Sequence, residues 1–127
     1  MEISNKLANL SALLGRILIG GLFAFGGITS ALNYEGFLQA VESGFSFWPH
    51  FFAIGALLIK ILGGLSLVFG LWTRWGLIAL IVFTVLATII YHPVATDPIG
   101  FSKNLMLLGG LLAYFGFGPG RYAIDSR

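Results

Sequence analysis

Residues 75–91 read WGLIALIVFTVLATIIY and contain no charged side chain. An α-helix rises 1.5 Å per residue, so about 20 residues cross a hydrocarbon core of ~30 Å. An uncharged apolar run of this length is typical of a helix that spans a membrane. The charge-free stretch continues to Thr96, and the loop after the span begins beyond Tyr91. We therefore predict a transmembrane helix over residues 75–91.

The composition of the whole chain also indicates a protein that lies in a membrane. Its 127 residues are 57% apolar without counting 18 glycines, and only 9% are charged, with a mean hydropathy of +0.94. A soluble domain carries about 25% charged residues, and a domain this small exposes a large share of its surface. So few charges cannot cover that surface in water. The composition therefore excludes an ordinary soluble domain and predicts a protein in lipid.

Three further apolar stretches complete the prediction of an all-α membrane protein built as a four-transmembrane-helix bundle. The loop after the first span holds a short amphipathic segment, which we predict to be a helix lying in the membrane interface. Its apolar and polar residues fall on different helical faces. The chain is treated as a single domain over residues 1–127, with spans at about 10–32, 51–71, 75–91 and 103–117. The apolar face carries Phe37, Leu38 and Val41, and the polar face carries Glu35, Gln39 and Glu42.

The distribution of charges predicts the orientation. Four spans place both termini on one side, and Lys and Arg in short loops favour the cytoplasmic side. We expect a multi-pass protein of the cell (inner) membrane with both termini in the cytoplasm. The terminal side carries Lys6, Arg74, Arg121 and Arg127, and the opposite loops carry Glu35, Glu42 and Asp97.

Several kinds of chemistry are excluded or disfavoured. The chain has no cysteine, so it forms no disulfide, thiolate nucleophile or Fe–S site. Its basic residues are scattered, which does not indicate nucleic-acid binding. No metal site is expected. His50 and His92 face the same side of the membrane, but ordinary interfacial histidines are far commoner than haem ligands, so haem is not expected. The sequence leaves enzymatic activity open.

Lys60 is the most unusual residue because it falls near the middle of the second predicted span. A charge at that depth costs at least ~2.5–3.5 kcal/mol, and no Asp or Glu lies within a predicted span. Lys60 could snorkel, lose its proton, bond to helix carbonyls or hydroxyls, or meet water or ligand oxygens. We predict that it lines the principal cavity, beside the glycine-rich first helix and the stripe formed by Thr84 and Thr88.

Other polar residues within or near the spans form two predicted groups. The first group could bind a lipophilic ligand between the helices: Lys60, Thr88, His92 and Tyr114. The second group is assigned to structure or interfaces. In it, Arg16 is expected to reach the membrane interface or a lipid phosphate, and Arg74 to stabilise the turn between Trp72 and Trp75. The full second group is Arg16, Arg74, Lys103 and Asn104.

These residues together resemble the DoxX family of bacterial and archaeal four-span membrane proteins. The resemblance rests on Arg16, Gly20 and Phe23, on Gly63-Gly64, Leu67 and Gly70-Leu71, on Thr73-Arg74 and His92, on Lys103-Asn104, and on the tail Gly118-Pro119-Gly120-Arg121-Tyr122-Ala123-Ile124-Asp125. The chain departs from the family by carrying Lys60 where a Glu is common, and Ser30 where a basic residue is often found.

Three functions follow as alternatives. Some DoxX relatives are subunits of a thiosulfate:quinone oxidoreductase and others associate with membrane oxidoreductase complexes, so the resemblance implies a quinone-binding or oxidoreductase-associated subunit. Without cysteine, a quinone is the expected redox partner. The same cavity could instead serve a carrier or receptor for a small hydrophobic molecule. The glycine-rich faces could also dock another membrane protein or a second copy of the chain.

Overall fold

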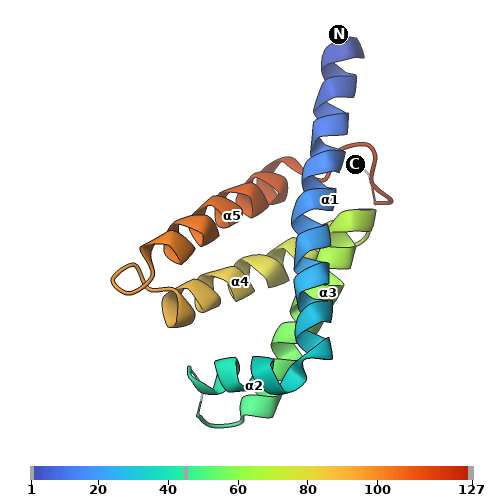
Figure 1. Ribbon diagram of the computed structural model, residues 1–127. Coiled ribbons are helices and arrows are strands. Elements are labelled where there is room, and N and C mark those ends of the chain that lie inside the picture. Colours follow the sequence, from blue (N-terminus) through green and yellow to red (C-terminus); the bar gives the residue numbers. More distant parts are fainter. Residues whose placement is uncertain (1, 45, 126–127) are drawn as a thin grey trace.

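The computed structural model describes residues 2–44 and 46–125, which fold into helices without a β-strand in the described part (Figure 1). The elements are α1 (Glu2–Leu32), α2 (Tyr34–Glu42), α3 (Pro49–Phe69), α4 (Thr73–Tyr91) and α5 (Pro98–Phe117). All except α2 are long and apolar enough to cross a bilayer. The predicted all-α, four-span fold with a short helix after the first span is confirmed.

The helix boundaries differ from the predicted spans, mostly at the N-terminal ends. The helix α1 begins at Glu2 instead of residue 10, and α5 begins at Pro98 instead of residue 103. Hydropathy marks only the apolar part of a helix, whereas its backbone hydrogen bonds continue into polar residues. At α5, the Asp97 carboxylate accepts a hydrogen bond from the Gly100 N–H at 3.1 Å. This cap fixes the start of the helix before the apolar run begins.

Residues with a left-handed backbone conformation set the start of α3, the end of α3 and the start of α4. Trp48 and Trp72 precede these helices with φ of 50° and 51°, so helical geometry starts at Pro49 and Thr73, two residues before each predicted span. Gly70 closes α3 with φ of 68°, which ends that helix at Phe69 instead of residue 71. Glycine adopts this conformation without steric cost.

Small residues bring α1 and α3 into close contact. A Cβ on Gly20 would collide with the carbonyl oxygen of Gly64, and a Cβ on Gly64 would lie 2.5 Å from the carbonyl oxygen of Gly20. Gly27 is equally constrained, since its Cβ would lie 2.6 Å from Ile61 Cγ1. Such small-residue contacts are a main route by which helices associate in lipid. The glycine-rich face of α1 therefore packs closely against α3.

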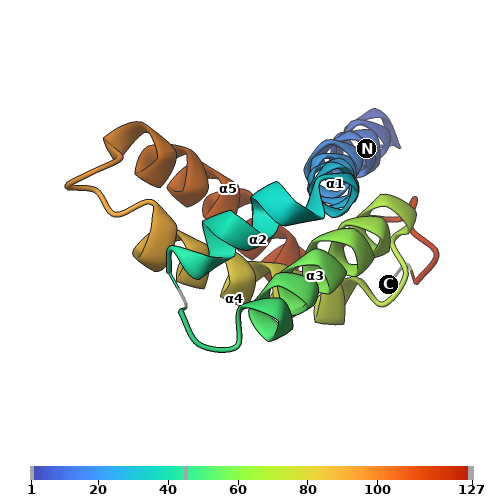
Figure 2. The same cartoon turned by 60° about the horizontal axis from the view of Figure 1, so that its bottom comes forward.

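The α4–α5 pair diverges from the α1–α3 pair, as Figure 1 shows. The two pairs meet at a small core formed by Leu67, Leu77, Leu80 and Leu111. The short helix α2 leaves the end of α1 and passes beside the start of α3 (Figure 2). The open angle between the pairs, with α2 across one end, positions the site described next.

Candidate ligand-binding site

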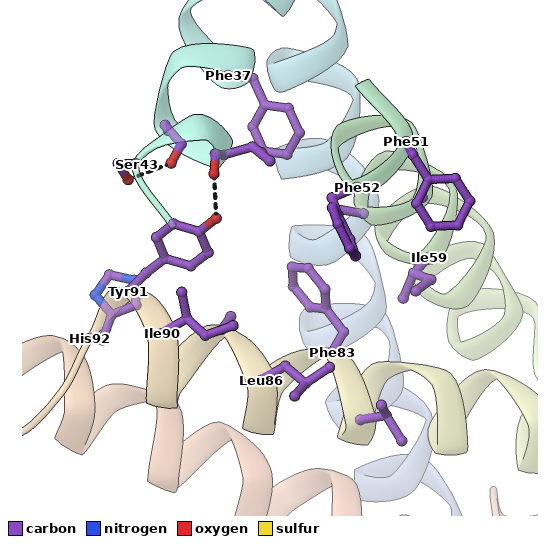
Figure 3. Close-up of a pocket in the computed structure, with 16 residues that line it drawn as sticks. Phe37, Ser43, Phe51, Phe52, Ile59, Phe83, Leu86, Ile90, Tyr91 and His92 are labelled. Carbon is purple, nitrogen blue, oxygen red and sulfur yellow. Dashed lines mark hydrogen bonds between the residues drawn. The ribbon is translucent and has the colours of Figure 1, made fainter. Parts of the chain in front are cut away.

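A pocket of about 650 Å³ lies between α2, α3 and α4 (Figure 3). Its walls are almost entirely apolar and rich in aromatic rings. The labelled rings of Phe37, Phe52 and Phe83 come from three different helices and face the same space. The lining residues are Phe37, Ala40, Val41, Ser43, Phe51, Phe52, Gly55, Ala56, Ile59, Val82, Phe83, Leu86, Ala87, Ile90, Tyr91 and His92.

Several apolar residues that line the pocket are exposed at the surface of the protein. Phe51 is 69% exposed, and Val82 and Leu86 are 52% and 51% exposed, although all three line the pocket. In a bilayer, such apolar surface contacts acyl chains. The pocket is therefore not closed off from the surface of the protein.

Polar groups gather at the end of the pocket near α2. The Tyr91 hydroxyl donates to the Val41 carbonyl at 2.9 Å and so ties α4 to α2. The Ser43 hydroxyl donates to the Ala40 carbonyl at 2.6 Å. Both donors are thus occupied within the protein, as the dashed lines in Figure 3 show. The imidazole of His92 at the rim offers a further donor or acceptor for a ligand.

The carboxylate of Asp97 orients His92. The distance from His92 Nδ1 to Asp97 Oδ2 is 2.7 Å. The pKa of Asp97 is lowered, first by this side-chain hydrogen bond and then by the backbone hydrogen bond from Gly100. An ionised carboxylate can only accept, so Nδ1 carries the hydrogen. Nε2 has no hydrogen-bond partner among the described residues, and it accepts when the ring is neutral and donates when the ring is protonated.

Of the four residues predicted to bind ligand, only His92 borders this pocket. The Thr88 hydroxyl donates to the Thr84 carbonyl at 2.6 Å and accepts from Asn104 Nδ2 at 3.0 Å, which joins α4 to α5. The Tyr114 hydroxyl donates to the Ala12 carbonyl at 2.9 Å, which joins α5 to α1. The structure therefore does not bring the predicted set together, because polar groups within the spans pair between helices.

Lys60 lies on the α1 side of α3, outside the pocket lining. Its Nζ is 5.7 Å from the ring centroid of Phe37. It is also 3.6 Å from the position that a Cβ on Gly26 would take. The predicted proximity to the glycine-rich first helix is confirmed. The prediction that Lys60 lines the main cavity is corrected, since the ring of Phe37 lies at the pocket wall and Lys60 does not.

Arg16 holds parts of the fold together, but the prediction that its side chain reaches the membrane interface or a lipid phosphate is wrong. It is fully buried instead of reaching the interface. Its guanidinium donates to the carbonyls of Leu67, Pro119 and Tyr122 at 2.7, 2.9 and 2.6 Å. The end of α3 and the returning tail leave these carbonyls without helical partners. Arg16 supplies the donors, because a guanidinium carries five N–H groups.

The tail, residues 118–125, completes this cluster. The N–H groups of Ile124 and Asp125 donate to the carbonyls of Phe69 and Gly70 at 3.2 and 2.8 Å. The Asp125 carboxylate accepts from both the N–H and the hydroxyl of Thr73, at 2.9 and 3.0 Å. Asp125 therefore caps the start of α4 from the far end of the chain. We call Arg16, Thr73, Asp125 and the tail the terminal cluster.

The other two residues predicted to be structural lie at the surface. The Arg74 guanidinium is 5.8 Å from the ring centroid of Phe115, which places it against α5. Lys103 is exposed, and its charge makes a small contribution to lowering the pKa of Asp97.

The sequence analysis missed the aromatic lining of the pocket. The sequence predicts that Phe37 and Val41 form the apolar face of a short helix that lies in the membrane interface. The several phenylalanines near these residues in the sequence are the feature that could have indicated an aromatic pocket. Phe83 belongs to a chain segment that is close to α2 only in three dimensions.

Comparison with known proteins identifies the family. The family model of DoxX matches residues 11–93. The chain belongs to the DoxX family. It is 32% identical over 123 residues to the inner membrane protein YqjF of Escherichia coli (strain K12), covering 94% of this chain and 93% of YqjF. Another relative from the same organism is the inner membrane protein YphA, at 26% identity with 91% and 88% coverage. No solved structure matches.

These relatives support a location in the inner membrane, in agreement with the four apolar helices. The DoxX match covers α2, α3 and α4, which together build the pocket. It ends before α5 and the tail, although the terminal cluster links that tail to Arg16 within the matched region.

Proposed function

We propose that this DoxX-family protein binds a lipophilic ring compound of the quinone class in the pocket, as a membrane subunit associated with an oxidoreductase. The observation that carries the proposal is the pocket between α2, α3 and α4. It combines aromatic walls, apolar lining residues that are exposed at the surface and an oriented histidine at one end.

The dimensions and chemistry of the pocket fit such a head group. Pockets for small ligands typically enclose about 300–1,000 Å³ and place a few polar groups on a mostly apolar wall. Phe37, Phe52 and Phe83 offer edges and faces against which a flat ring can pack. An isoprenoid chain attached to the ring would leave through the opening beside Phe51 and Leu86 and continue among the acyl chains.

His92 can serve both forms of the ligand. When protonated, its Nε2–H donates to a quinone carbonyl oxygen. When neutral, Nε2 accepts from a quinol hydroxyl. Asp97 holds Nδ1 in both states, so the ring keeps its orientation while its outward nitrogen changes role.

Photolabelling locates the bound compound. An azido-ubiquinone analogue is irradiated with the purified protein in a mild detergent, with and without excess decylubiquinone. Labelled peptides are expected from α2, α3 and α4 around the pocket, and decylubiquinone should abolish that labelling. Label confined to the outer face of α5, or label that decylubiquinone does not displace, would contradict the proposal.

A second candidate is a carrier for a small hydrophobic molecule without electron transfer. It is favoured by the exposed apolar lining and by the small number of polar groups among the described lining residues. Mass spectrometry of the lipid extract from purified protein separates the two. Enrichment of quinone over the membrane extract supports the subunit, and enrichment of a different hydrophobic compound supports the carrier.

For the orientation, we propose that both termini are cytoplasmic, as the Lys and Arg bias predicts. The chain has no native cysteine, so single cysteines can be introduced cleanly. Ser43→Cys should react with an impermeant thiol reagent from outside the inner membrane, and Ser126→Cys, at a position outside the described residues, should not. Labelling of the Ser126→Cys variant alone would reverse the orientation.

A further inference from the structure

We propose that Lys60 forms a second binding site, separate from the pocket, for the carboxylate of a lipid acid such as a free fatty acid. The proposal does not rest on the quinone assignment. It rests on the environment of the ammonium group and on the open space beside it.

The ammonium has no hydrogen-bond or ion-pair partner within the described residues. An ammonium carries three N–H donors. Its one polar interaction here is with the ring face of Phe37 at 5.7 Å, which uses at most one side of the group. Lys60 lies near the middle of α3, where lipid tails offer no acceptor. The oxygen atoms of a bound molecule would supply acceptors for these unpaired donors.

The surface of α1 beside the ammonium carries no side chain at Gly26. At Gly20 and Gly27 an added Cβ would collide with α3, so close packing explains those glycines. At Gly26 the nearest atoms to an added Cβ are Lys60 Nζ and Cε, at 3.6 and 3.7 Å, which is ordinary contact. Packing against α3 thus does not require glycine at position 26. Its missing side chain leaves a notch directly beside the ammonium.

The position of the notch selects a carboxylate among the anionic groups that lipids carry. Phe37 comes from α2, the amphipathic helix at the end of the bundle, and its ring lies between that helix and Lys60. A phospholipid phosphate stays at the water interface. A fatty acid can enter the apolar layer as the neutral acid and transfer its proton to Lys60 in the amine form, which leaves a carboxylate beside an ammonium. The resulting ion pair has no net charge, and the acyl chain remains in lipid.

The test measures binding of radiolabelled oleate to delipidated protein in a non-ionic detergent. Wild-type protein should bind oleate, and unlabelled oleyl alcohol should not displace it. Lys60→Met should weaken binding by at least about tenfold, while Lys60→Arg, which keeps the charge, should stay within about threefold. Gly26→Leu fills the notch and should also abolish binding, whereas Gly21→Leu, where an added side chain meets open space, should not.

Circular dichroism melts verify that each variant is folded, and quinone photolabelling of the Lys60→Met variant should be unchanged. Equal oleate binding by wild type and Lys60→Met would overturn the proposal. Displacement by oleyl alcohol as effective as by oleate would also overturn it, because it would show a site for the chain alone. Displacement by dioleoylphosphatidylglycerol at lower concentration than by oleate would assign the site to a phosphate and overturn the carboxylate.

Discussion

The two ends of the bundle use polar residues in opposite ways. At the terminal cluster, Arg16 is fully buried and its donors meet carbonyls from α3 and the tail. At the α2 end, His92 stands at the rim of an open pocket with Nε2 unused by the described residues. The difference separates a part of the molecule whose polar groups pair with one another from a part that leaves an open pocket. The most polar cluster here therefore stabilises the fold, and the more apolar region is the candidate site.

Removing the guanidinium should have the largest effect on stability. Arg16→Met leaves the carbonyls of Leu67, Pro119 and Tyr122 without their donor. Each unsatisfied buried acceptor costs about 1–3 kcal/mol, so the total loss should reach about 3 kcal/mol or more. Denaturant unfolding in detergent measures it. Arg74→Lys, at an exposed position, is the control and should change little; equal stability of both variants would break the comparison.

A methyl group between α1 and α3 should have the next largest effect. Gly20→Ala forces the helices apart at Gly64 and should cost about 2 kcal/mol by overpacking. Gly21→Ala adds the same methyl group on the same helix where no atom lies within 4 Å, and should be neutral or slightly stabilising. Thermal melts of the pair measure the difference, and matching melting temperatures would argue against this packing.

Loss of the tail cap should have a smaller effect. Asp125→Ala removes the acceptor for the N–H and hydroxyl of Thr73 and should cost about 1 kcal/mol, in the range of an N-cap deletion. Protection of the first amides of α4 from hydrogen exchange should fall with it. Unchanged exchange at the start of α4 would show that the tail does not cap this helix.

The smallest effect should come from Asp97 and should depend on pH. Its pKa is lowered in the folded protein by the hydrogen bonds from His92 and Gly100. Its contribution to stability is therefore present above the unfolded-state pKa of about 3.9 and is lost as the pH falls through the lower folded-state pKa. Asp97→Asn should melt below wild type at neutral pH, and the gap should narrow in acid. A gap that widens in acid would reverse the sign of this interaction.

Much of the fold could be predicted because lipid imposes simple rules on a sequence. The uncharged run at residues 75–91 predicts a helix locally, and so do the separate apolar and polar helical faces of the segment around Phe37. The partners of Arg16 could not be predicted in the same way. They depend on the tail folding back to α3, and Arg16 and Pro119 are 103 residues apart in the chain. Burial of that arginine is a consequence of tertiary structure.

The site was harder to predict than the fold, for a physical reason. Lys60, Thr88 and Tyr114 are predicted site residues because they are polar groups within apolar spans. Such groups tend to form hydrogen bonds with one another between helices, as Thr88 does with Asn104. The pocket is defined by shape, through Phe37, Phe83 and the divergence of α3 and α4. Shape of this kind arises from helix angles, which single-sequence patterns do not specify.

The most direct test of the central claim is the quinone content of protein purified in a mild detergent. Ala87→Phe places a ring inside the pocket, and Ala113→Phe places the same ring on the exposed face of α5. The account predicts that wild type and Ala113→Phe retain extractable quinone, whereas Ala87→Phe loses most of it with an unchanged melting temperature. Equal quinone content in all three folded proteins, or none in wild type, would contradict the assignment of the pocket as a quinone site.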